Sequence, residues 1–142
     1  MWYHSYTKID LAKIFSIAAR AHAQQFRRDG LTPYFSHPVR VCERVQKHGL
    51  EAQAVALLHD TLEDTPLTQG EILRVAGQTV YDAVLALTHY GNESYDDYLQ
   101  RVKKNDLARI VKVADILDNL SDDPSRRQIV KYARALLYLI EK

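Results

Sequence analysis

Several residue types that mark other classes of protein are scarce in this chain. Its 142 residues contain one cysteine, Cys42, which excludes an intrachain disulfide and a cysteine zinc cluster and favours a reducing compartment. No apolar run approaches the about 20 residues of a membrane span, and the N-terminal residues lack the pattern of a secretion signal. These absences predict a cytoplasmic protein with no membrane segment.

Charge of one sign is also lacking. Lysine and arginine number 19 against 18 aspartates and glutamates, which leaves a net charge of +1. Binding to a nucleic acid polymer or to an anionic membrane is therefore not indicated, and any anion site must be local. The apolar fraction of 46% is ordinary for a globular protein, and no linker divides the chain. Residues 1–142 are predicted to form a single domain.

Glycine and proline are few, at five and four, and apolar residues recur at intervals of three and four. This pattern predicts an all-α fold. The expected helices cover about Thr7–Gln25, Pro38–His48, Ala52–Thr65, Gln69–Gly77, Thr79–Thr88, Tyr95–Lys104, Asp106–Leu120 and Arg126–Ile140. The expected core includes Leu11, Ile14, Phe15, Ala18, Ala21 and His22 of the first helix, Val80, Val84 and Leu87, then Leu107, Ile110, Ala114, Leu117 and Leu120. In the last helix, core is favoured over interface for Ile129, Leu136, Leu137 and Ile140.

The third of these segments carries the most unusual chemistry. His59, Asp60, Glu63 and Asp64 lie within an otherwise apolar run. On one helix, residues four apart share a face, which places His59 above Glu63 and Asp60 above Asp64. Burying so many charges is costly without compensation, and a metal ion is the compensation that we expect.

Other segments offer further ligands. His37 begins a helix and Asp115 lies inside a later one, so that two imidazoles and two carboxylates are available with His59 and Asp60. Nitrogen and oxygen ligands suit manganese, iron or magnesium-like ions better than a structural zinc site. Glu63 and Asp64 are then placed to orient a water and move protons, which predicts metal-assisted hydrolysis of a phosphoester or phosphoanhydride.

A structural role is the alternative for several of these residues. His22 and His89 are expected to be hydrogen-bonded core histidines rather than ligands. The pair Glu63 and Asp64 also fits a solvated helix end, and Arg27 with Arg28 fits a solvated basic pair.

Three motifs together resemble the HD-superfamily phosphohydrolases: H-P at 37–38, H-D-T-L-E-D-T at 59–65 and V-K-V-A-D-I-L-D-N-L at 111–120. The nearest likeness is to the alarmone hydrolase domain of the RelA/SpoT homologues in its small free-standing form, from about Ala21 to Arg127. The resemblance implies a compact HD-type helical bundle with one metal site. In that family the metal is usually manganese, and the resemblance implies that His37, His59, Asp60 and Asp115 hold it here, with Fe²⁺, Co²⁺ or Mg²⁺ as alternatives.

The same resemblance implies that Glu63 and Asp64 serve the attacking water and that the 3′-pyrophosphate is removed from ppGpp or pppGpp. The segment R-R-D-G-L-T-P-Y resembles the family's Arg-Lys-x-G-x-P-Y, in which the first basic residue packs on the nucleobase and the second lies near phosphate. The substrate contacts that follow are Arg27, Arg28, Tyr34, Lys112 and Asn119.

The chain departs from the family pattern at Ile116, where a basic residue is common, and at Ser121 and Asp122, where an Arg-Thr pair is common. These differences concern the substrate more than the metal. Two alternatives therefore stand beside alarmone hydrolysis: a phosphatase acting on NADPH or a nucleoside monophosphate, and a non-catalytic helical module that binds nucleotide or metal. A monomer and a homodimer are both compatible with the sequence.

Overall fold

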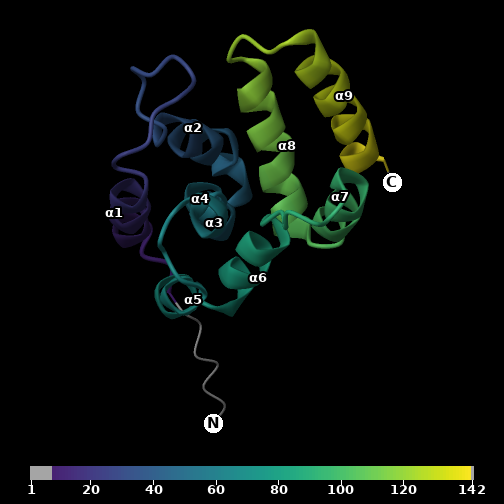
Figure 1. The fold of residues 1–142 in the computed structure, drawn as a ribbon. Helices are drawn as coiled ribbons and strands as arrows, with labels where there is room; N and C mark the ends of the chain where they lie inside the picture. Colours follow the sequence, from purple (N-terminus) through teal and green to yellow (C-terminus); the bar gives the residue numbers. More distant parts are fainter. Residues whose placement is uncertain (1–7, 142) are drawn as a thin grey trace.

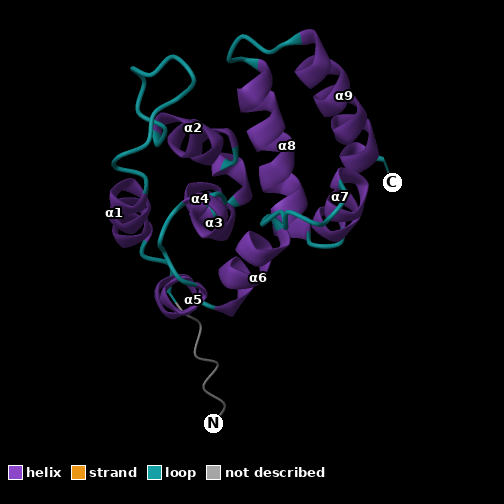
Figure 2. Ribbon diagram, viewed as in Figure 1, coloured by secondary structure: helices purple, strands orange, loops and turns teal. Residues whose placement is uncertain are grey.

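A computed structural model describes residues 8–141 of the protein. The regular structure of these residues is helical apart from one isolated bridge between Phe26 and Pro33 (Figure 2). This confirms the all-α class. The helices are α1 (Leu11–Ala21), α2 (Ser36–Arg44), the 3-10 turn η1 (Gln46–His48), α3 (Leu50–Leu58), α4 (Thr61–Asp64), α5 (Gln69–Ala76), α6 (Gln78–Ala86), α7 (Tyr95–Lys103), α8 (Asp106–Leu120) and α9 (Arg126–Ile140).

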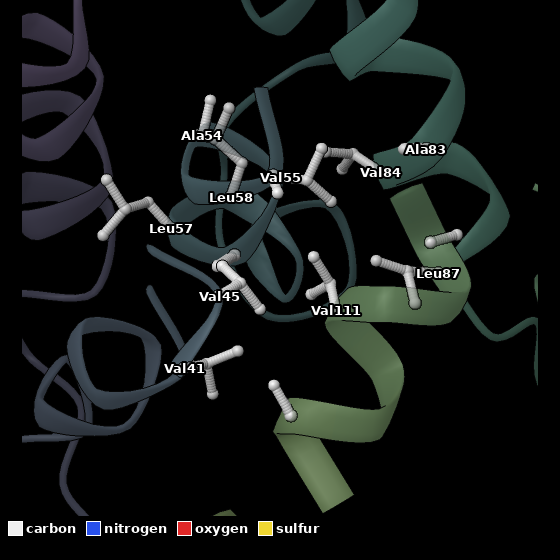
Figure 3. Packing of buried hydrophobic residues seen from close by; sticks show 14 of the residues in the cluster. Val41, Val45, Ala54, Val55, Leu57, Leu58, Ala83, Val84, Leu87 and Val111 are labelled. Atoms are coloured by element: carbon white, nitrogen blue, oxygen red, sulfur yellow. The ribbon is translucent and has the colours of Figure 1, made fainter. Parts of the chain in front are cut away.

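Helix α3 lies at the centre of the molecule (Figure 1). It packs against α1, α2, α6 and α8, and a helix enclosed in this way must be apolar on most of its surface. Its residues from Ala54 to Leu58 are all buried. Figure 3 shows side chains from around α3 packing near its own, among them Val45 just after α2, Val84 of α6 and Val111 of α8. Each fully buried valine or leucine contributes about 1.5–3 kcal/mol relative to an exposed one, so α3 is firmly held.

Five helix starts follow from polar side chains that accept a backbone N–H, the first being Asp10, which caps α1. Thr68 and Ser125 form capping boxes with Glu71 and Gln128, and Ser94 caps α7. For α8 the cap is Asn105 and not Asp106, because the Asn105 side chain accepts from the Ala108 N–H.

The predicted core faces of three helices need correction. Phe15 of α1 is 44% exposed, and Thr7 lies outside the described residues. In α8, Leu117 is 42% exposed. This helix contacts α2, α3 and α6 and also α7 and α9, but Leu117 lies on the part of its surface that these neighbours leave uncovered. The buried residues of α8 are therefore Ala108, Val111, Ala114, Asp115, Ile116 and Asp118. In α9 only the side facing α7 and α8 is covered, which leaves Ile129, Leu137 and Ile140 exposed while Leu136 packs against the core.

The predicted helix from Ala52 to Thr65 is two helices. Helix α3 ends at Leu58, and α4 begins at Thr61. The Thr61 hydroxyl donates to the Leu58 carbonyl at 2.7 Å, a local bond that competes with the regular helical pattern. His59 and Asp60 therefore occupy the junction of two helices. Among residues 8–141, no helix has both the length and the apolar character needed to cross a membrane.

Candidate metal centre

Four side chains from three separate segments meet in the interior. His37 comes from the first turn of α2, His59 and Asp60 from the α3–α4 junction, and Asp115 from the middle of α8. His37 Nε2 lies 2.7 Å from Asp115 Oδ1, and His59 Nε2 lies 3.3 Å from the same oxygen. Asp60 Oδ2 lies 3.1 Å from His59 Nε2 and 4.0 Å from His37 Nε2. The fold therefore brings together all four residues that the sequence singled out as ligands.

Both imidazoles are oriented through their other nitrogen. His59 Nδ1 donates to the Ala56 carbonyl at 2.6 Å, which leaves Nε2 facing the carboxylates. His37 Nδ1 lies 2.6 Å from Asp118 Oδ2. Asp118 is completely buried and also accepts from the Arg40 guanidinium at 2.9 and 3.1 Å. Such partners fix the ring orientation of a metal-binding histidine.

Sequence reasoning missed Asp118. The signal was available, because Asp118 follows Asp115 by three residues and therefore shares its face of α8. A second carboxylate on the same buried face, one turn from a predicted ligand, indicates an orienting residue for one of the histidines.

The charges of the cluster depend on one another. Burial alone lowers the pKa of His59, but the carboxylates of Asp60 and Asp115 beside it raise that pKa well above its usual value. Burial raises the pKa of Asp115, yet the Lys112 ammonium and the two imidazoles outweigh burial and hold this pKa well below the usual range. A protonated imidazole thus balances the carboxylates, and a divalent cation held by the same atoms would replace that proton.

Asp60 is held from a second side by Tyr34. The Tyr34 hydroxyl donates to Asp60 Oδ2. Burial, followed by the charge of Asp60, raises the pKa of Tyr34, so the hydroxyl stays a donor. Burial also raises the pKa of Asp60, but His59 and the Tyr34 hydrogen bond lower it to about 2 overall. Tyr34, which was expected at the substrate, therefore also contacts a predicted metal ligand.

Glu63 and Asp64 lie at the exposed edge of the cluster. Their carboxylate oxygens and those of Asp60 lie within 4.8 Å of one another. Asp60 and Asp64 thus come together as predicted, whereas His59 joins His37 and Asp115 and is not grouped with Glu63. Partial desolvation raises the pKa of Glu63 and of Asp64, and the nearby charge of Asp60 adds to both shifts. Raised carboxylate pKa values suit groups that accept a proton near neutral pH.

Backbone contacts hold this pair in place. Glu63 accepts the backbone N–H of His89. The Asp64 carbonyl accepts from Gln25 Nε2 at 2.6 Å, and Gln25 Oε1 lies 2.7 Å from His22 Nδ1. His22 is buried and hydrogen-bonded as expected for a core histidine. His89 is not a core residue: it is exposed beyond the end of α6, with Nε2 2.9 Å from the Glu93 carbonyl.

Two of the expected substrate residues contact the same predicted metal ligand, Asp115. Lys112 Nζ lies 2.9 Å from Asp115 Oδ2, and Asn119 Nδ2 donates to Asp115 Oδ1 at 3.3 Å. Both lie within one turn of Asp115 on α8. Lys112 therefore offsets the charge of Asp115 before any substrate is present.

The two arginines of the loop before α2 lie over the connection between α8 and α9. Arg27 donates through Nε and Nη2 to Asp122 Oδ2 at 3.1 and 2.6 Å. Arg28 donates to the Asp122 carbonyl at 3.3 Å and to Gln128 Oε1 at 3.4 Å. The Arg27 guanidinium also lies over the Tyr34 ring, 5.8 Å from its centroid.

The departures from the family pattern have distinct structural roles. Ile116 is completely buried and belongs to the core. The Ser121 hydroxyl donates to the Asp118 carbonyl at 2.6 Å and so closes the end of α8. Asp122 faces the predicted substrate loop, where its carboxylate compensates the charge of Arg27.

Comparison with known proteins identifies the family. The HD domain family matches residues 15–138. The chain belongs to the HD-domain family. Over 124 residues, it is 38% identical to the guanosine-3′,5′-bis(diphosphate) 3′-pyrophosphohydrolase MESH1 of Xenopus tropicalis, covering 75% of this chain and 65% of that protein. Over 137 residues, it is 28% identical to the enzyme of the same activity from Aquifex aeolicus, covering 86% of this chain.

The match spans only 20% of the Aquifex protein's length. Among solved structures, this HD-domain chain resembles a metazoan ortholog of SpoT, described as hydrolysing ppGpp, with a TM-score of 0.79 at 24% identity. The likeness covers 95% of this chain and 87% of that one. At this identity the structural comparison confirms the fold.

Removal of one carboxylate should abolish metal binding. We expect Asp115→Asn to lose stoichiometric divalent metal, because a buried anionic ligand is replaced by a neutral amide. Metal content of the purified protein, measured by elemental analysis, tests this. Asp106→Asn, an exposed change on the same helix, should keep the metal content. Full metal retention by Asp115→Asn would overturn the assignment.

Asp118 should make the stability of the metal-free protein depend on pH. Burial raises its pKa, but bonds from Arg40 and His37 outweigh burial and lower that pKa below 3.8. Its charged form is thus favoured by folding, a contribution present above pH 4 and lost as the pH falls through the lowered pKa. We expect Asp118→Asn to lose about 1–3 kcal/mol of unfolding free energy at pH 7. In denaturant titrations, the difference from the unsubstituted protein should shrink toward pH 3, and a constant difference would contradict this account.

Proposed function

We propose that this HD-domain chain is a metal-dependent phosphohydrolase that removes the 3′-pyrophosphate from ppGpp or pppGpp. One observation carries the proposal: the four donors His37, His59, Asp60 and Asp115 converge within 4.0 Å along their closest contacts, with Glu63 and Asp64 at their open edge. The names of the relatives from Xenopus and Aquifex support the choice of reaction.

The donor set supports a single divalent ion, and we propose Mn²⁺. Two imidazole nitrogens and two carboxylate oxygens match the preference of manganese and iron, and no thiolate is near to favour zinc, since Cys42 lies elsewhere on α2. When bound, such an ion lowers the pKa of a water and polarises a phosphoryl oxygen.

The protein's own residues position the reaction. Glu63, with its raised pKa and its backbone anchor at His89, orients the attacking water and accepts its proton. Asp64, fixed by Gln25, is close enough to pass that proton on. Lys112 lies beside Asp115 and offers positive charge at the edge of the cluster, where the negative charge of the reacting phosphoryl group must be accommodated.

The nucleoside end of the substrate is proposed to occupy a small slot beside the cluster. The slot has a volume of about 180 Å³ and is lined by Phe26, Arg27, Arg28, Tyr34, Asn119, Gln128 and Tyr132. Three aromatic rings and a flat guanidinium favour stacking with a nucleobase. The ion pair with Asp122 keeps the Arg27 guanidinium beside Tyr34, where it forms one wall of the slot.

One observation favours the alternative of a less phosphorylated substrate, such as NADPH or a nucleoside monophosphate. Asp122 cancels the charge of Arg27. The larger hollow of about 730 Å³ next to the slot is lined by three basic and three acidic residues, Arg27, Arg28, Arg40, Asp29, Asp122 and Asp123. Such a balanced lining attracts a polyphosphate less than a basic one would.

A turnover panel tests the proposed reaction. With Mn²⁺ supplied, we expect release of pyrophosphate from ppGpp and pppGpp, identified by chromatography and phosphorus NMR. Orthophosphate released from NADPH or a monophosphate would establish the alternative substrate, and a panel left unchanged would establish a non-catalytic module. Glu63→Gln should keep its metal but lose about 10²–10⁴-fold in kcat. Glu51→Gln, an exposed change at the start of α3, should keep the full rate.

The charge of Asp122 should set the affinity for polyphosphates. Asp122→Asn keeps an acceptor for Arg27 but removes the negative charge, so we expect KM for ppGpp to fall by about 3- to 10-fold at low salt and the gain to shrink as salt rises. Asp123→Asn changes the net charge equally but removes no contact with Arg27. An equal fall in KM for both variants would show that overall charge, and not the Arg27–Asp122 pair, is responsible.

A further inference from the structure

A groove between α7 and α9 has no role in the site described above. Its volume is about 750 Å³, and it runs from Tyr95 at the start of α7 to Tyr138 near the end of α9 (Figure 1 shows the two helices side by side). Arg127, Lys131 and Arg134 line it from one face of α9, at intervals of four and three residues. The face of α9 along the groove is therefore basic.

Lys131 lies near two aromatic rings. Its Nζ lies 4.3 Å from the centroid of the Tyr95 ring and 5.7 Å from that of Tyr132. Within residues 8–141, neither Lys131 nor its neighbour Arg127 lies within ion-pair distance of a carboxylate, although Asp96 also lines the groove. Partial desolvation, followed by the charges of Lys112 and Arg127, lowers the pKa of Lys131. Positive charge is therefore concentrated at Lys131 and Arg127, and no carboxylate of residues 8–141 lies within ion-pair distance of either.

The Tyr95 end of the groove adjoins the candidate metal centre. The Tyr95 and Tyr98 ring centroids are 5.8 Å apart, and Lys112 Nζ lies 5.3 Å from the Tyr98 centroid and 2.9 Å from Asp115 Oδ2. The Tyr95 hydroxyl is enclosed and has no hydrogen-bond partner among the described residues.

We propose that the Tyr95 end of this groove binds the outer phosphate of a pyrophosphate group whose inner phosphate lies at the metal centre, with Lys131 as the principal cation. The inference rests on the proposed hydrolase function and adds a residue to it. Lys112 is already paired with Asp115, so a second phosphate requires another cation, and Lys131 is the adjacent one. Tyr132 joins this subsite to the nucleobase slot, because it lines that slot and contacts Lys131.

Such a subsite makes the chain distinguish a pyrophosphate from a monophosphate ester. A monophosphate ends at the metal centre and gains nothing from Lys131. A charge-assisted hydrogen bond to a second phosphate strengthens the binding of a pyrophosphate substrate by about tenfold. The subsite therefore opposes the effect of Asp122, which weakens polyphosphate binding at the nucleoside end.

Lys131→Gln tests the subsite in catalysis. We expect KM for ppGpp to rise about tenfold while kcat changes less than about threefold, with Lys131→Arg restoring most of the affinity. Hydrolysis of a nucleoside monophosphate, if present, should be unaffected. The exposed Lys104→Gln at the end of α7 is the matched control and should leave KM unchanged. An unaltered KM for ppGpp in Lys131→Gln would refute the subsite while leaving the hydrolase function standing.

A binding measurement separates this inference from the proposed activity. Calorimetric titration of the Mn²⁺-loaded protein with inorganic pyrophosphate should show binding that weakens about tenfold in Lys131→Gln and persists in Lys104→Gln. Orthophosphate should bind more weakly and respond less to the substitution. If the turnover panel shows no hydrolysis, pyrophosphate binding that depends on Lys131 still supports the anion subsite. Equal binding by both variants overturns it whatever the turnover panel shows.

Discussion

The mutual compensation of buried charges at His37, His59, Asp60 and Asp115 is the constraint on which the rest of the structure depends. Each group alone is costly in the interior, and the cluster is tolerable only while three separate segments hold its members within hydrogen-bonding distance. The tightly packed α3 places the junction, α2 presents His37, and α8 supplies both Asp115 and the orienting Asp118. The packing of the core helices therefore also sets the positions of the charged side chains in the site.

Around the cluster, the surfaces that face a substrate differ in charge. At one end, Asp122 offsets Arg27 and leaves a slot dominated by aromatic rings. At the other, Lys131 and Arg127 lie near Lys112 in a basic groove. A ligand with a flat ring at one end and a pyrophosphate at the other fits this polarity. The four predicted metal ligands lie at the centre of this arrangement, within the region that matches the HD-domain family, and the proposed substrate choice rests on its two ends.

Much of the helical framework was predictable because its signals are local. Thr68, Ser94 and Ser125 each satisfy backbone N–H groups within three residues, so their helix starts follow from neighbouring side chains alone. Burial of Phe15, Leu117 and Leu137 was predicted wrongly, because periodicity shows that a helix has an apolar face but not which neighbours cover it. The break after Leu58 was missed because it depends on the bond from the Thr61 hydroxyl to the Leu58 carbonyl. A single threonine within a helical pattern is only a weak sign of such a break.

The sequence by itself determined the helical class and predicted the chemistry of the centre, since two histidines and two aspartates in apolar surroundings need their charges compensated whatever their arrangement. Only the tertiary structure decided which of these residues lie together and which lie at the exposed edge. It placed His59 with His37 and Asp115, left Glu63 and Asp64 at the edge, and turned Asp122 toward Arg27. The reason is physical: residue types set which charges need compensation, but pairings between residues about 80 or more positions apart depend on how helices pack.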